Sequence, residues 1–168
     1  MTEYNLEVNK KDQVIGKRPR EDFYTGQYIH LSSHLILFNS KNQILLQKRV
    51  KTKKWYPNLY TFSVSATVAD ETYKECLKRE IVEEIGISMP IKFLFKYPFF
   101  DKKDKAFHAI FTGKSDKEIK PDQREISQII CINPKNLKQD LKQNPQKYTP
   151  PFRQGMKIFF KNFIKNVI

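Results

Sequence analysis

Three glutamates at helical spacing are the residues of this chain whose positions best suit metal chemistry. Glu80, Glu83 and Glu84 stand at positions i, i+3 and i+4. At 3.6 residues per turn, their side chains project from one helix face within an arc of about 100°. Like charges so placed repel one another unless a cation joins them, and magnesium prefers oxygen ligands. The alternative is an ordinary solvated helix face on which the glutamates pair with Lys78 and Arg79.

The segment from Thr72 to Ile85 is predicted to be the helix that carries these glutamates. Thr72 and Glu75 have the spacing of a capping box, and Gly86 stands where a helix commonly ends. Apolar residues recur every four positions, as expected of a core-facing stripe: Leu77, Ile81 and Ile85. Because this stripe lies beside the arc of glutamates, the carboxylates are expected at the edge of the core, partly sheltered from water.

The remaining segments predict a sheet accompanied by further helices. Runs rich in β-branched and aromatic residues predict strands at 30–39, 43–49, 60–68, 91–95, 106–111 and 126–132. Helices are expected at 134–141 and at about 152–166. Pro150 and Pro151 are expected to interrupt the secondary structure just before the second helix. An N-terminal hairpin is expected at about residues 5–20. This pattern is typical of an α+β fold, here a single domain spanning residues 1–168.

Composition restricts the setting more than the function. The 168 residues contain no apolar run long enough to span a membrane, and the N-terminus lacks the apolar stretch of a signal peptide. Cys76 and Cys131 have no metal-ligand spacing, which favours free thiols in a reducing, cytoplasmic setting. The net charge of +13 favours anionic partners. Because lysines are scattered along the whole chain, a nucleic-acid partner is not favoured. Without a long apolar run, no membrane partner is expected. The oligomeric state stays open.

The residues around the glutamates resemble the Nudix box. That pattern reads Gly-x5-Glu-x7-Arg-Glu-apolar-x-Glu-Glu-x-Gly-apolar, and residues 65–87 match it except that Ser65 replaces the leading Gly. Outside the box the likeness extends loosely over residues 5–165, in an order of segments similar to the branch that resembles isopentenyl-diphosphate isomerase. The resemblance implies a Nudix-type α/β/α sandwich with a central mixed β-sheet, acting as a diphosphate hydrolase.

The resemblance also implies roles for individual residues. It implies that magnesium, with manganese as the alternative ion, is held by Glu71, Glu80, Glu83 and Glu84. Glu83 or Glu84 would also polarise water, so that Glu80, Glu83 and Glu84 form the catalytic set. Arg79 matches the arginine that braces the carboxylates, and Gly86 matches the glycine that ends the helix. Both are therefore expected to be structural.

Basic residues near the end of the 43–49 strand are candidate phosphate ligands. Arg49, Lys48 on the opposite strand face, and Lys54 in the following loop can supply charge-assisted hydrogen bonds. Glu125 matches a position where some family members carry an accessory acid near the metal. The alternatives are a solvated basic loop and an ordinary surface glutamate.

Two departures from the box keep other functions open. Ser65 and Asp70 stand where many members have glycine, which supports a catalytically weakened Nudix-fold binding or regulatory protein. Ser65 and His30 match the catalytic Cys and a metal-binding His of the isomerase, but Ala66 to Val68 lack its following His. An isomerase-like enzyme is therefore less favoured. His30 is interpreted as an ordinary strand histidine, and His34 and His108 show no partner pattern.

The favoured function is magnesium-dependent cleavage of a diphosphate linkage. The expected substrate is a nucleoside diphosphate derivative or a related small molecule, because the box fixes the reaction and leaves the attached group to loops outside it.

Overall fold

A seven-stranded mixed sheet forms the centre of the computed structural model, which describes residues 2–167. Its strands are β3 (His30–Phe38), β4 (Ile44–Arg49), β5 (Tyr60–Thr61), β6 (Val64–Thr67), β7 (Lys92–Phe100), β8 (Lys105–Lys114) and β9 (Ile126–Ile132). The order β5-β4-β3-β8-β7 makes β7 an edge strand, while β6 also pairs with β3 and β9 with β4. The sheet is mixed because β3 and β8 run parallel and the other pairs run antiparallel.

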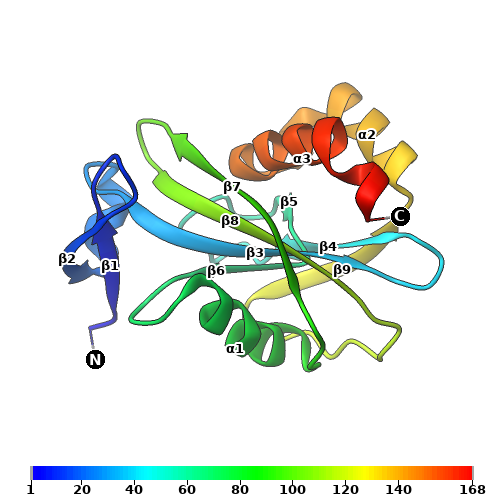
Figure 1. The fold of residues 1–168 in the computed structure, drawn as a ribbon, viewed down its shortest axis with the longest axis horizontal. Coiled ribbons are helices and arrows are strands. Elements are labelled where there is room, and N and C mark those ends of the chain that lie inside the picture. Colours follow the sequence, from blue (N-terminus) through cyan, green and yellow to red (C-terminus); the bar gives the residue numbers. More distant parts are fainter. Residues whose placement is uncertain (1, 168) are drawn as a thin grey trace.

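Helices cover both faces of the sheet (Figure 1). Helix α1 (Tyr73–Ile85) lies on one face, and α2 (Pro134–Gln143) and α3 (Pro150–Asn162) lie on the other. Strands β1 (Tyr4–Val8) and β2 (Val14–Pro19) form a separate antiparallel hairpin at one end of the molecule. Short 3₁₀ helices lie at Arg20–Thr25, Pro145–Lys147 and Ile164–Asn166. The layers confirm the predicted α+β sandwich, and no helix within residues 2–167 has the length and apolar character needed to cross a membrane.

Each helical layer packs on its own apolar core. Leu77, Ile81 and Ile85 of α1 are buried against residues of β3 and β8, which confirms the predicted stripe. On the other face, Phe152, Met156 and Phe159 of α3 are fully buried in a core that also receives side chains from β3, β4 and β7. A third, smaller cluster joins the β1–β2 hairpin to the sheet. Burial of these side chains is the dominant favourable term in forming the layers.

Helix α1 begins and ends as its sequence predicts. The Thr72 side chain accepts a hydrogen bond from the Glu75 amide, and the Glu75 carboxylate accepts one from the Thr72 amide, which completes the capping box. At the other end Gly86 has a left-handed backbone, with φ 71°, and its amide donates to the Val82 carbonyl. A Cβ would be strained in that conformation, so glycine suits the position.

Several expected boundaries were wrong, and the last helix, for example, ends at Asn162 instead of about residue 166. Residues 60–68 form two strands rather than one, because β5 pairs with β4 whereas β6 pairs with β3. The chain changes partner at Ser63, whose hydroxyl accepts from the Leu37 amide and donates to the Leu45 carbonyl. The two prolines expected to precede the last helix instead form the first turn of α3, where their missing N–H groups cost nothing.

Strand β7 also runs further than expected, from Lys92 to Phe100. It continues through Pro98, which an edge strand tolerates because one side of its ladder is free.

Strand β3 organises the opening in the sheet that matters for the site. One of its edges pairs with β8 along the whole strand. The other edge pairs with β6 at Ser32–Leu35 and with β4 only at Leu37 and Phe38. Strands β4 and β6 therefore leave the same edge of β3 and diverge, and side chains from both are exposed where they separate.

Replacing Gly86 tests the backbone at the end of α1. Gly86→Ala is expected to lower the free energy of unfolding by about 1–2 kcal/mol, the cost of a left-handed backbone for a residue with a Cβ. Gly86→Asn places the same Cβ near Lys120, which would lie 3.1 Å away, but asparagine tolerates positive φ better. Its loss in urea unfolding should be smaller. Equal losses would assign the cost to crowding against Lys120.

Candidate active site

A polar cavity of about 620 Å³ lies where β4 and β6 diverge. Helix α1 forms one wall, β3 and β8 contribute side chains to the inner end, and the loop between β4 and β5 adds Lys53, Trp55 and Tyr56. Thr149 and Pro151, at the start of α3, also line the cavity. The cavity therefore joins residues from the Nudix-like box to residues that lie far from it in the sequence.

The three glutamates of α1 all line this cavity, but their surroundings differ. The side chain of Glu83 is 56% exposed, that of Glu80 is 20% exposed, and Glu84 is buried with 5% exposure. The three side chains thus range from exposed to buried around the helix. The glutamates were predicted to lie at the edge of the core, partly sheltered from water, and they do.

Arg79 holds the outer carboxylates together. Its guanidinium donates to Glu71 Oε1 at 2.6 Å, to Glu80 Oε1 at 2.8 Å and to Glu83 Oε2 at 3.0 Å. These contacts raise the pKa of Arg79, mainly through the hydrogen bond to Glu71. One cation therefore offsets part of the repulsion among three anions. Arg79 has the bracing position expected of it, and Glu71 belongs to the network without lining the cavity.

Within residues 2–167, Glu84 forms no ion pair with an arginine, and its charge is disfavoured instead. Burial, together with the negative charge of Glu80, raises its pKa to about 8. A hydrogen bond of 2.9 Å from Gln47 Nε2 acts in the opposite direction but does not cancel the burial. Burial raises the pKa of Glu80 as well. Glu80 keeps its contact with Arg79, whereas Glu84 lacks a positively charged partner that would offset its burial.

The donor set fits a hard divalent cation. Carboxylate oxygens from Glu80, Glu83 and Glu84 face the same cavity, and such oxygens suit magnesium or manganese. The buried and undercompensated Glu84 is the position where a cation would remove most electrostatic cost. Within residues 2–167, no three His, Cys, Asp or Glu side chains are already gathered closely enough to form a ready-made ligand cluster. Arg79 at present occupies oxygens of two of the three carboxylates.

The basic residues divide between the cavity and the surface. Arg49 lines the cavity, where its Nε donates to the Trp55 carbonyl at 3.0 Å. Lys48 does not line it, because neighbouring strand residues point to opposite faces; its Nζ lies 5.5 Å from the centre of the Tyr60 ring. Lys54 also lies outside the lining, with its Nζ 4.5 Å from the centre of the Tyr24 ring. The structure therefore brings Arg49, but neither lysine, to the glutamates.

Lys53 and Arg20 occupy the place that the two surface lysines were expected to take. Both line the cavity, and Lys53 forms an ion pair with Glu125, which lines it too. Burial, together with the positive charges of Arg49 and Arg20, lowers the pKa of Lys53 to about 8. Arg20 donates to both carboxylate oxygens of Glu3 at 2.9 Å. Glu125 thus neutralises a lysine in this structure.

A chain of hydrogen bonds between histidines lines the inner end of the cavity, and sequence reasoning missed it. His34 Nδ1 lies 3.0 Å from Ser65 Oγ, and His34 Nε2 lies 2.8 Å from His108 Nδ1. Burial lowers the pKa of His34 to about 3 and that of His108 well below its usual value, so both rings are neutral. Among the residues that the structure describes, His108 Nε2 has no hydrogen-bond partner.

His30 belongs to a second buried polar group. Its Nε2 lies 3.0 Å from Asp104 Oδ1, and the Tyr56 hydroxyl donates to Asp104 Oδ2, also at 3.0 Å. These contacts hold the pKa of the buried Asp104 below its usual value, against the effect of burial. His30 is thus a satisfied strand histidine, as interpreted. One sequence signal for this group existed: His30, Ser32 and His34 alternate, which places them on one face of β3.

Known proteins share these features of sequence. The NUDIX domain profile matches residues 28–152. A Methanosarcina mazei protein named prenyl-diphosphate phosphatase is 45% identical over 159 residues, which cover 92% of this chain and 94% of the relative. The uncharacterized Nudix hydrolase YfcD of Escherichia coli K12 is 25% identical over 167 residues, which cover 98% and 91% of the two chains.

Solved structures share the fold. The crystal structure of DR0079 from Deinococcus radiodurans superposes with a TM-score of 0.81 at 22% identity, covering 92% of this chain and 98% of that one. The MutT protein from Methanosarcina mazei Go1 has a TM-score of 0.67 at 20% identity, covering 79% and 94%. With a profile that spans most of the chain and a relative that shares close to half of its residues, this protein belongs to the Nudix family and is a Nudix hydrolase.

Proposed function

We propose that this protein hydrolyses the diphosphate of a prenyl diphosphate with the help of magnesium, or manganese in its place. The observation that carries the proposal is a single cavity in which Glu80, Glu83 and Glu84 share the lining with Arg49 and Lys53. The likeness to a prenyl-diphosphate phosphatase supports the choice of organic group. Water would add its oxygen to one phosphorus as the P–O–P bond breaks. The products would be a prenyl monophosphate and inorganic phosphate.

The glutamates and the bound cation would divide the work. Glu80, Glu83 and Glu84 would hold the ion. Glu71, which now accepts a hydrogen bond from Arg79, would serve as an accessory ligand. When bound, such an ion neutralises charge on phosphate oxygens and lowers the pKa of water. Glu84, which is buried and hydrogen-bonded to Gln47, is the carboxylate best placed to take a proton from water in a sheltered site. Glu83, the most exposed of the three, lies nearest to the solvent from which water arrives.

Arg49, Lys53 and Arg20 would bind the phosphate oxygens that the cation leaves free. Arg49 is held by the Trp55 carbonyl, so its guanidinium is already oriented. A buried, oriented arginine loses little conformational entropy when it binds an anion. Lys53 would exchange its contact with Glu125 for one with phosphate. Lys48 and Lys54, which were expected to act here, contribute at most to the general positive field.

The aromatic residues of the cavity favour a prenyl group over a nucleoside. The ring of Trp55 is stacked on His30 at a centroid distance of 5.0 Å, and it contacts Tyr24 at 4.3 Å. Its face is thus already used in packing, and a nucleobase would have to displace His30 to stack there. The isomerase-like alternative is weaker, because Ser65 is hydrogen-bonded to a neutral His34 and is a far poorer proton donor than a thiol. The free thiols of Cys76 and Cys131 support a cytoplasmic setting.

Removing one carboxylate charge tests whether α1 carries the catalytic metal. Glu83→Gln keeps the size of the side chain and is expected to lower kcat by at least ~100-fold at saturating magnesium, on the order of 3 kcal/mol of transition-state stabilisation. The matched control is Glu118→Gln, an exposed glutamate outside the cavity, which should leave the rate within about twofold of the parent. If Glu83→Gln keeps the parent rate, α1 does not carry the catalytic metal, and if the parent itself shows no turnover, a binding or regulatory role takes precedence.

The substrate class is tested by comparing products. Prenyl diphosphates are expected to release inorganic phosphate at least ~10-fold faster, in kcat/KM, than nucleoside diphosphate derivatives, a difference of about 1.4 kcal/mol. Product analysis by mass spectrometry should find the prenyl monophosphate. Faster turnover of a nucleoside diphosphate derivative would instead identify nucleoside diphosphate derivatives as the substrate class. Incorporation of deuterium into the prenyl carbon chain from heavy water would instead support the isomerase-like reading.

Glu84 should make the stability of the metal-free protein depend on pH. Its pKa is raised to about 8 on folding, from 4.5. A raised folded pKa gives stability that is full below the unfolded pKa and is lost as pH rises through the folded pKa. In chelator, the free energy of unfolding should therefore fall between pH 6.5 and 8, by up to about 1.4 kcal/mol per pH unit.

The same urea titrations on Glu84→Gln supply the control. This variant cannot ionise at residue 84, so the fall should be absent. His34 and His108 are neutral in the folded protein, but in the unfolded chain they lose their protons near pH 6.5. Their contribution has the opposite sign and is the same in both proteins, so the difference between the two titrations reports Glu84. Magnesium should restore stability to the parent at pH 8 and have less effect on the variant. A pH-independent parent would contradict the assignment of Glu84 as the undercompensated carboxylate.

A further inference from the structure

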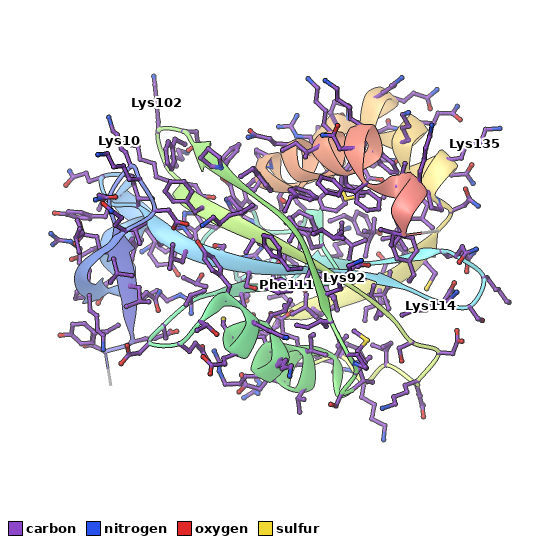
Figure 2. The ribbon with its side chains drawn as sticks, in the orientation of Figure 1. Lys10, Lys92, Lys102, Phe111, Lys114 and Lys135 are labelled. Atoms are coloured by element: carbon purple, nitrogen blue, oxygen red, sulfur yellow. The ribbon has the colours of Figure 1, made fainter. Side chains whose placement is uncertain are left out.

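Two turns at the hairpin end of the molecule each carry exposed apolar side chains beside lysines. Val14 and Ile15, where β2 begins, are 56% and 60% exposed, and Phe100, at the end of β7, is 43% exposed. Exposed lysines stand in the same two turns. The two-turn patch consists of Lys10, Lys11, Val14, Ile15, Phe100, Lys102 and Lys103. Figure 2 labels one lysine from each turn, Lys10 and Lys102, at the same end of the protein.

Contacts between the turns hold the patch in place. Asp12, in the β1–β2 turn, forms an ion pair with Lys96 of β7 and accepts a hydrogen bond of 3.2 Å from the Tyr73 hydroxyl. Phe100 packs edge-on against Phe107 of β8, with ring centres 5.5 Å apart. The hairpin is thus tied to β7, the strand that leads into the second turn. Its exposed side chains belong to a structured surface.

The patch carries a net positive charge, because its four lysines outnumber Asp101, the exposed acid in the second turn. Within residues 2–167, none of its four lysines has an acidic side chain at ion-pair distance. The two nearby exposed or half-buried acids are engaged elsewhere: Asp12 with Lys96, and Asp101 with the amides of Lys103 and Asp104. Lysines that surround exposed aliphatic and aromatic side chains are the composition of surfaces that bind at a membrane interface.

We propose that the two-turn patch docks this protein onto an anionic lipid surface. The lysines would contact lipid headgroups, and Val14, Ile15 and Phe100 would enter the interface. A nucleic acid would satisfy the lysines but would leave the apolar side chains in water, so lipid is the better match. Such a contact needs no helix that spans the membrane. The proposal therefore departs from the sequence analysis, which expected no membrane partner.

The patch also adjoins the active-site cavity. Trp55 lines the cavity, and its Nε1 donates to the carbonyl of Lys103, in the patch, at 3.4 Å. A protein docked through the patch would hold this wall of the cavity close to the lipid. The docking proposal stands on the surface itself and does not depend on the identity of the substrate. If the substrate is a prenyl diphosphate, docking would bring the enzyme to the lipid surface, where molecules with an apolar chain and a charged head concentrate.

Sedimentation with vesicles tests the proposal on the full chain. The protein is mixed with vesicles of phosphatidylcholine alone, or of phosphatidylcholine with phosphatidylglycerol, at low and physiological salt. We expect binding at least ~10-fold tighter to the anionic vesicles. A variant with Lys10→Gln, Lys11→Gln, Lys102→Gln and Lys103→Gln should lose at least ~10-fold of that affinity. A second variant, Val14→Ser with Ile15→Ser, keeps the charge and should also bind more weakly.

A matched control separates the patch from the net charge of +13. Lys135→Gln, Lys138→Gln, Lys142→Gln and Lys157→Gln remove the same charge from exposed positions on α2 and α3, and Figure 2 shows Lys135 at the far end of the molecule. This variant should bind within about threefold of the parent. Equal losses in the two lysine variants, or no loss on serine substitution, would overturn the proposal. So would binding to single-stranded RNA but not to vesicles.

Thermal melts of all variants show whether they fold. Release of phosphate from a water-soluble diphosphate reports the active site separately, so a failed hydrolase assignment and a failed docking surface give different results.

Discussion

The cavity depends on helix α1, which must bury apolar side chains in the core and place carboxylates in the cavity from adjacent positions. Helix α1 buries Ile81 and Ile85 against the sheet and turns Glu84, between them, toward the cavity. Packing fixes the helix, so the carboxylates cannot move apart to relieve their repulsion. Arg79 offsets this repulsion on the outer side, and a proton does so at Glu84, whose pKa is raised to about 8. The remaining imbalance would supply the proposed affinity for a cation, because the apolar core holds together anions that would otherwise separate.

Strand β3 supplies the second half of the site through a change along one of its faces. Its alternate residues Ile36 and Phe38 pack in the core beneath α3. Earlier in the same series, His30 and His34 line the cavity. One strand face therefore passes from polar to apolar where β4 replaces β6 as the neighbour. This divergence gives the buried histidines access to a cavity, and hydrogen bonds to Asp104 and His108 satisfy the Nε2 atoms of His30 and His34.

Local signals explain what could be predicted from the sequence. The capping box, the apolar stripe and Gly86 are all encoded within residues 72–86, so α1 and the direction of its glutamates followed from spacing alone. The pairing of His34 with His108 spans 74 residues and was not visible, because only the parallel contact of β3 with β8 brings the two together. Lys48 and Lys54 were expected near the phosphates and Lys53 was missed for a similar reason: the path of an irregular loop decides which lysine turns inward, and no periodicity encodes that path.

The cavity has two chemically different ends, and this difference determines how a substrate lies in it. The outer end combines Glu80 and Glu83 with Arg49 and Lys53, all suited to a phosphate and its cation. At the inner end the lining histidines His34 and His108 are neutral, and Asp104 is engaged by His30 and Tyr56. The first turn of α3 adds no anion site there, because Pro150 and Pro151 have no N–H to donate. A diphosphate placed at the inner end would lose its water without gaining a cation. The proposed substrate would therefore keep its diphosphate at the glutamates and extend its uncharged organic group inward.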